Sequence, residues 1–206
     1  MNTDFIRVCG LFVIFFLAGS CFASPCVLID EGQANATIVV PQGGDNLLMR
    51  TATDIQDVLE SMTGVQLPIQ NDGSSVTGNR ILLGQTVWTD AVVSPAERQT
   101  LAGDGFILRR AGSDIALVGS NSYGVAYAAS EMLERLGARW FLPGPLGEVI
   151  PELDVVEFDV LDVRAEPSFG LPWVSREDAW NLRIRSNRID DQRLPQAYVV
   201  YPGISH

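Results

Sequence analysis

Two stretches of this sequence repeat apolar residues at intervals of three and four, which places their side chains on one face of an α-helix. The first stretch spans 45–62 and the second spans 121–136. Short apolar or β-branched runs, typical of strands, lie before and after each of them. A helix with one apolar stripe must bury that stripe against another element. We therefore expect both helices to pack on a common β-sheet.

Both predicted helices begin at residues that commonly cap helices. Asp45 or Asn46 starts the first helix, and Asn121 or Ser122 starts the second. Gly64 ends the first helix, because glycine readily adopts the left-handed conformation found at helix ends. The buried stripes are predicted to be Leu48, Ala52, Ile55, Val58, Leu59 and Met62 in the first helix, and Val125, Ala128, Ala129, Met132, Leu133 and Leu136 in the second.

The order of the remaining elements predicts the fold class. Ser94-Pro95-Ala96-Glu97 forms a capping box, which predicts a short helix that ends at Leu101. The resulting pattern predicts an α/β (α+β) two-layer sandwich, with a mixed β-sheet and the two long helices on one face. The predicted strands are 36–40, 65–69, 80–83, 105–110, 115–119 and 138–142, with 155–163 as a last strand.

The predicted strands 105–110 and 115–119 form a hairpin, and the alternation of its side chains indicates how the sheet is covered. Phe106 and Leu108 alternate with Ile107 and Arg109, which is typical of a sheet with one covered face. The glycine-containing loop 119–124 follows the hairpin. It lacks the Lys-Ser/Thr ending of a phosphate loop, so we interpret it as a turn and helix cap.

Aromatic residues are candidate sugar contacts, because aromatic rings can cover the apolar faces of pyranoses. Trp140 and Phe141 follow the second long helix, and this position favours buried packing over a ligand site. Trp173 lies between a proline and a charged segment, and it has less reason to be buried. Trp173 is therefore the candidate substrate-binding residue.

The first 23 residues are predicted to be a signal peptide. Val8–Ala18 is an apolar run too short to span a bilayer, and it precedes a cleavage site after Ala23. Leu17–Cys21 also resembles a lipoprotein signal, in which Cys21 would be lipidated, and a retained anchor is a third possibility. We expect a secreted or periplasmic protein, or alternatively one that is lipid-anchored at the cell envelope, with membrane contact only through Cys21.

Composition excludes several functional classes. The net charge of −11 argues against nucleic-acid partners, which require a concentrated basic surface. All 14 basic residues are arginine, so no lysine is present to form a Schiff base. His206 is the only histidine, which excludes a histidine metal cluster and leaves a catalytic triad dependent on the last residue. We expect no metal, no cofactor and no catalytic residue in this chain.

Residues 166–206 have a different composition from the preceding domain, 24–165. Their apolar runs are short, so we expect this tail to dock on the first domain or to stay partly disordered. Glu177-Asp178 and Asp190-Asp191 are adjacent carboxylates, whereas a glycosidase needs two acids facing each other across a sugar. We therefore interpret these acids as solvated charge.

The run from Leu133 to Phe141, Leu-Glu-Arg-Leu-Gly-Ala-Arg-Trp-Phe, is followed by Pro143-Gly144 and Gly147-Glu148. Together with Tyr123-Gly124 and Tyr127-Ala128, it resembles the N-terminal domain of bacterial alpha-glucuronidases. It is similar also to related secreted glycoside-hydrolase-like proteins and to the second domain of beta-hexosaminidases. The resemblance covers about residues 30–165.

This resemblance implies a non-catalytic accessory domain that precedes a (β/α)8 barrel, in which the catalytic acids lie at the C-terminal face. It also implies that Glu166–Phe169 leads into the first barrel strand and that Trp173 contacts substrate. Trp180–Asn187 resembles the stretch that follows in the family. The sequence ends at His206, near the expected second barrel strand, so no catalytic acid is carried over. We expect an incomplete barrel-start tail.

Three functional hypotheses follow from the sequence. The first is the N-terminal domain of a secreted glycoside hydrolase that acts on polysaccharide, with carbohydrate as the partner of the full-length protein and this chain inactive by itself. The second is a free-standing exported module that binds glycan or protein. The third is a non-functional remnant. The sequence favours no oligomeric state.

Overall fold

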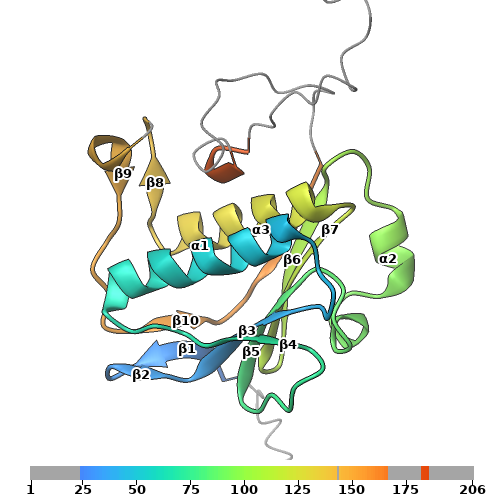
Figure 1. Cartoon of the computed structure of the whole chain (residues 1–206), viewed down its shortest axis with the longest axis horizontal. Helices are drawn as coiled ribbons and strands as arrows, with labels where there is room; N and C mark the ends of the chain where they lie inside the picture. The colour runs from blue at the N-terminus through green and yellow to red at the C-terminus, as the bar shows by residue number, and fades with distance from the viewer. Residues whose placement is uncertain (1–23, 143, 167–181, 186–206) are drawn as a thin grey trace, which may run out of the picture.

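The computed structural model describes residues 24–142, 144–166 and 182–185 (Figure 1). A six-stranded mixed sheet with the order β11-β6-β7-β5-β3-β4 forms its centre. β3, β4, β5 and β7 run parallel, whereas β6 is antiparallel to both β7 and β11. Its strands are β3 (Ala36–Val40), β4 (Ile69–Asn71), β5 (Asn79–Leu83), β6 (Phe106–Ala111), β7 (Asp114–Gly119) and β11 (Asp162–Ala165).

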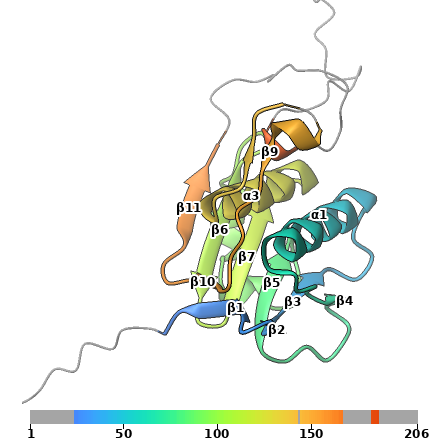
Figure 2. The same ribbon diagram turned by 90° about the vertical axis from the view of Figure 1, so that its left-hand side faces the viewer.

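The two long helices, α1 (Asn46–Thr63) and α3 (Ser122–Arg135), lie side by side on one face of this sheet (Figure 2). The predicted caps are confirmed: Asp45 accepts a hydrogen bond from the backbone N–H of Leu48 at 2.9 Å, and Asn121 caps α3. Gly64 ends α1 with a φ of 73°. The predicted two-helix layer over a mixed sheet is therefore confirmed.

The main core lies between these helices and the sheet. It combines the apolar stripes of α1 and α3 with alternate residues of the strands, and burial of this apolar area is the main stabilising term of the fold. Its fully buried side chains include Leu28, Ile38, Ile55, Leu59, Ile81, Leu83, Leu108, Ile115 and Leu117.

The other face of the sheet is also covered, contrary to the expectation of one covered face. The connection between β5 and β6 crosses it, and this connection contains the 3-10 helix η1 (Thr89–Ala91) and the short helix α2 (Pro95–Gln99). Val93 packs there against Ile107, which is 1% exposed. The capping box of Ser94 is confirmed, but α2 ends at Gln99 and not at Leu101.

Strand boundaries differ from prediction where short strands pair outside the central sheet. No strand was predicted in 24–35, yet β1 (Cys26–Asp30) and β2 (Gln33–Ala34) lie there. The single strand predicted over 155–163 is two: β10 (Val156–Phe158), which pairs with β1, and β11. β1 also pairs with β2, giving a three-stranded antiparallel sheet.

Two further predicted strands are shorter than expected. The strand predicted over 65–69 begins only at Ile69, because Pro68 has no N–H to donate to a strand neighbour. The strand predicted over 138–142 is β8 (Arg139–Trp140). It does not join the central sheet but pairs with β9 (Glu148–Val149). The 3-10 helix η2 (Pro145–Gly147) lies between them.

Candidate functional site: a docking face on the paired helices

The surface of α1 and α3 that faces away from the sheet carries a segment from the tail, Leu182–Arg185 (Figure 1). Leu182 and Ile184 pack against the main core, and the Ser130 hydroxyl donates a hydrogen bond to the Leu182 carbonyl at 3.1 Å. The segment forms a single turn in which the Arg185 N–H bonds the Leu182 carbonyl, also at 3.1 Å. We call the surface that holds the segment the docking face. It is formed by α1 and α3 together with the paired strands β8 and β9, and it comprises Asp54, Ser130, Glu131, Glu134, Trp140 and Glu148.

Arg183 makes the most extensive contacts with the docking face. Its Nη2 and Nε contact Asp54 Oδ1 at 2.6 and 3.1 Å, and its Nη1 contacts Glu148 Oε1 at 2.7 Å. The guanidinium lies over the Trp140 ring, 5.3 Å from the centroid. Burial lowers the pKa of Arg183, but Asp54 and Glu148 outweigh burial and raise its pKa above the ordinary value. The side chain is therefore held as a cation between two carboxylates.

Arg185 binds two acids on α3. Its Nη2 lies 2.7 Å from Glu131 Oε2 and also contacts Glu134. Glu131 and Glu134 are three residues apart, so both carboxylates lie on the same side of the helix. Glu131 is shared with Arg135 at 2.9 Å. The two tail arginines thus occupy separate acidic positions of the docking face.

A groove of about 580 Å³ lies between α1 and α3, beside Leu182. Its carboxylates, Asp54 and Asp57, both come from α1, and Asp54 is paired with Arg183. Many glycoside hydrolases use two acids that flank the scissile bond. Among the described residues, the acids of the groove come from one helix only, which does not match that arrangement.

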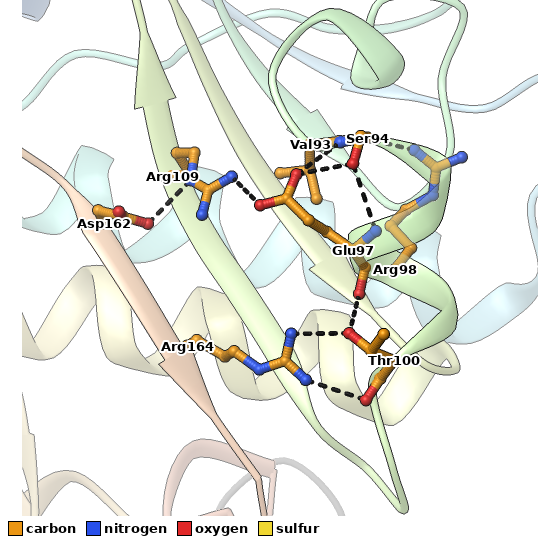
Figure 3. A network of polar contacts seen from close by, with 8 residues as sticks. All are labelled: Val93, Ser94, Glu97, Arg98, Thr100, Arg109, Asp162 and Arg164. Atoms are coloured by element: carbon orange, nitrogen blue, oxygen red, sulfur yellow. Dashed lines mark hydrogen bonds and ion pairs between the residues drawn. The ribbon is translucent and has the colours of Figure 1, made fainter.

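A second polar network ties α2 to the far face of the sheet (Figure 3). Arg109 Nη1 contacts Glu97 Oε1 at 2.7 Å, and its Nε contacts Asp162 at 2.8 Å. Hydrogen bonds from Arg109, and then from Ser94, lower the pKa of Glu97 to about 2. Arg164 donates to the Thr100 hydroxyl and carbonyl at 2.9 Å. Each of these polar groups is hydrogen-bonded or ion-paired with another, so the network links α2, β6 and β11 and is structural.

The residues considered as sites from the sequence have different outcomes. Trp140 is 6% exposed, which confirms buried packing, but Phe141 is 67% exposed, so its predicted burial is wrong. Phe141 lies beyond the end of β8, in the connection to β9 and outside the central sheet. Trp173, the substrate-binding candidate, and Cys21, the lipidation candidate, lie outside the described residues.

The loop 119–124 serves the packing of α3. The Asn121 side chain accepts a hydrogen bond from the Gly124 N–H at 3.1 Å. A Cβ on Gly124 would lie 2.6 Å from the Gly105 carbonyl oxygen, so glycine is required where α3 approaches the hairpin. This geometry supports the interpretation of the loop as a turn and helix cap.

Within the described ranges, no three histidine, cysteine or acidic side chains gather closely enough to hold a metal ion. In the same part of the chain, no helix has the length and apolar character needed to cross a membrane.

Sequence reasoning missed the docking face. Arg183 and Arg185 lie in the tail, within the Trp180–Asn187 run, and the sequence predicts no site at them or at Asp54, Glu131 and Glu134. One signal was present in the sequence. Two arginines alternate with two aliphatic residues, Leu182 and Ile184, which is a pattern that can place apolar and cationic side chains on the same partner surface.

Comparison with known proteins gives partial likenesses. No protein-family model and no curated protein matches the sequence. A structure of CpGH84D matches with a TM-score of 0.35 and 16% identity over 47% of this chain and 17% of that one. Two mutants of Streptomyces plicatus beta-hexosaminidase, each in complex with the product GlcNAc, match with a TM-score of 0.37 and 16% identity, over 66% of this chain and 23% of theirs.

The chain therefore spans less than a quarter of the length of these solved structures. Likeness at this level assigns neither family nor activity to the chain.

Proposed function

We propose that this chain is the non-catalytic N-terminal domain of a secreted, alpha-glucuronidase-like glycoside hydrolase that acts on polysaccharide. Its role is to hold the polypeptide that follows it. The observation that carries the proposal is the docking of Leu182–Arg185, from beyond the sheet, on the paired helices. The resemblance of the Leu133–Phe141 run to such domains supports the same role.

The chemistry of the described acids supports a holding role. Asp54 and Glu148 neutralise Arg183, and Glu97 is bound by Arg109. A general acid for glycoside hydrolysis needs a raised pKa, whereas the pKa of Glu97 is lowered. These carboxylates therefore stabilise the fold and the docked segment.

The coding sequence after His206 gives a direct test. A reading frame there that encodes a (β/α)8 barrel with two acids at the C-terminal ends of its strands supports the proposal. A second test uses the purified chain with glucuronoxylan and amino-sugar oligomers, for which we expect no hydrolysis. Hydrolysis that is lost in an Asp54→Asn variant would overturn the proposal.

A free-standing binding module is the alternative, and one observation favours it. Around the β8–β9 connection, Phe141, Leu142, Leu146 and Val149 are each more than half exposed. An apolar surface of this kind is typical of interaction sites. Saturable binding of an oligosaccharide by the purified chain, followed by tryptophan fluorescence, would favour this alternative, whereas flat titrations would count against it.

A further inference from the structure

We propose that the docking face is a recognition site for peptide segments of the form arginine-x-arginine, in which the first arginine dominates the affinity. This inference deepens the holding role in the proposed function and rests on the same docked segment, because it states which chemistry the face binds. The ligand is a short turn that carries two arginines and two aliphatic side chains, as Leu182–Arg185 does.

The position of Arg183 explains why the first arginine dominates. Carboxylates from two different elements, Asp54 of α1 and Glu148 of β9, together bind Nε, Nη1 and Nη2. A planar guanidinium can satisfy both carboxylates at once, whereas a lysine ammonium is a single point of charge. The site is therefore expected to discriminate arginine from lysine at this position.

Trp140 adds a third contact to the first-arginine position. Its indole N–H has no hydrogen-bond partner among the described residues, and the ring presents its face to Arg183. An aromatic face attracts a guanidinium by a cation–π interaction, which is stronger where the cation is shielded from water. Only 15% of the Arg183 side chain is exposed, which strengthens both this contact and the ion pairs.

The second arginine has a less specific environment. Arg185 uses only Nη2 to contact Glu131 and Glu134, and its side chain is 33% exposed. One nitrogen between two carboxylates of the same helix can be supplied by lysine as well as by arginine. The second position should therefore require a positive charge but not a guanidinium.

Backbone and aliphatic contacts set the register of the segment. The hydrogen bond from Ser130 fixes the carbonyl of Leu182, directly before the first arginine. Leu182 and Ile184 reach the core, so the two arginines cannot slide along the face without exposing these side chains. The spacing of one residue between the arginines is thus part of what the face recognises.

A peptide supplied in trans tests this proposal. The face is vacated in cis by the variant Leu182→Ser/Arg183→Ala/Ile184→Ser/Arg185→Ala of the full chain, which removes both the ion-pairing and the aliphatic side chains of the segment. A fluorescein-labelled peptide with the sequence of residues 179–188 is then titrated and followed by anisotropy. We expect saturable binding to the vacated chain and binding at least ~10-fold weaker to the wild-type chain, because the covalently linked segment competes at high effective concentration.

Peptide and face variants supply the specificity controls. Lysine at the peptide position of Arg183 should weaken binding at least ~10-fold, and lysine at the position of Arg185 only ~2-fold. Asp54→Asn in the vacated chain should abolish binding, whereas Asp57→Asn, which removes the same charge from the same helix, should leave it unchanged. Leu182→Ser/Arg183→Gln/Ile184→Ser/Arg185→Gln provides a second vacated chain, which retains polar side chains at the two arginine positions.

Three outcomes would overturn the proposal: no binding to either vacated chain at millimolar peptide, equal binding of arginine and lysine peptides at the first position, or equal effects of Asp54→Asn and Asp57→Asn. None of these outcomes depends on a catalytic domain. A failure here is therefore distinguishable from a failure of the proposed function, which is tested by the downstream reading frame.

Discussion

The guanidinium of Arg183 lies over the indole of Trp140, so that a residue of the domain core also forms part of its docking face. Trp140 is 6% exposed and belongs to the same apolar cluster as the stripes of α1 and α3. The strand that carries it, β8, is held by β9, which supplies Glu148 to the same arginine. Core packing and docking are therefore coupled through one small hairpin.

The first prediction concerns protection of the docked arginines from trypsin, which cleaves after Arg183 and Arg185 when they are accessible. Asp54→Asn leaves the guanidinium of Arg183 with an incomplete set of partners, so we expect cleavage at both sites to accelerate several-fold. Time-resolved mass spectrometry of the digest measures this rate. Asp57→Asn is the matched control, and equal acceleration in both variants would contradict the role of Asp54.

The second prediction concerns the pair formed by Arg80 on β5 and Asp114 on β7. Arg80 Nε and Nη2 bind the two carboxylate oxygens at 2.7 and 2.8 Å, and its guanidinium lies 4.5 Å from the Trp88 ring centroid. Both side chains are less than one fifth exposed. Asp114→Asn leaves a mostly buried cation incompletely paired, so we expect the free energy of unfolding to fall by roughly 2–4 kcal/mol.

Urea unfolding measures this loss. The control is Asp90→Asn, because the Asp90 carboxylate also pairs with an arginine, Arg98, but its side chain is 56% exposed. Glu131→Gln would not serve, because Glu131 also binds Arg185 in the docking face. Exposed pairs contribute about 0–1 kcal/mol. A loss in Asp114→Asn no larger than in Asp90→Asn would show that burial does not strengthen the Arg80 pair.

The third prediction concerns the close approach of α3 to the hairpin of β6 and β7. The methyl group of Gly124→Ala would meet the carbonyl oxygen of Gly105 at 2.6 Å, and neither backbone can move away freely. We expect a loss of about 1–3 kcal/mol or more from overpacking. Gly112→Ala is the comparison: its φ is 60° with nothing within 4 Å of the added Cβ, so it should cost only about 1 kcal/mol.

Urea midpoints of the two glycine variants provide this measurement. The expected order, with Gly124→Ala less stable than Gly112→Ala, distinguishes a steric contact from a backbone preference. The reverse order would mean that α3 can shift away from the sheet at little cost.

The fourth prediction concerns pH and the network around Glu97. Arg109 and Ser94 lower the pKa of Glu97 from 4.5 to about 2 in the folded chain. A lowered pKa in the folded state stabilises the fold above the unfolded value, and this contribution is lost as pH falls from about 4.5 to about 2. The melting temperature of the wild type should therefore fall over this range more than that of Glu97→Gln.

Thermal unfolding by circular dichroism at several pH values checks this prediction. The two melting curves should differ at pH 6 and converge near pH 2. Glu157→Gln, at an exposed position on β10, serves as the control and should follow the wild type throughout. A constant difference between Glu97→Gln and wild type at every pH would contradict the assignment.

The helical layer was predictable from the sequence because its signals are local. The stripes of α1 and α3 repeat over several turns, and the cap residues Asp45, Asn121 and Gly64 stand at their ends. The sequence therefore indicated which surfaces must meet and where each helix begins. Placement of both helices on one face of a mixed sheet follows from the order of elements.

The small sheets and the docking face were not predictable in this way. β1 and β10 each have five residues or fewer and pair across more than 120 residues of sequence, so no local periodicity marks them. The carboxylates that bind Arg183 come from α1 and β9, and their convergence depends on the complete fold. Surface acids on a helix look alike in sequence whether they face water or a docked arginine.

The pairing of β1 with β10 has a mechanical consequence. Cys26 in β1 lies opposite Phe158 in β10, and the chain then continues into β11, which pairs along β6 as far as the Ala165–Phe106 pair. Two short antiparallel ladders therefore close the domain, β1–β10 near its beginning and β11–β6 near its end. A force applied to the two ends of the domain would have to open both ladders before it reached the central parallel strands.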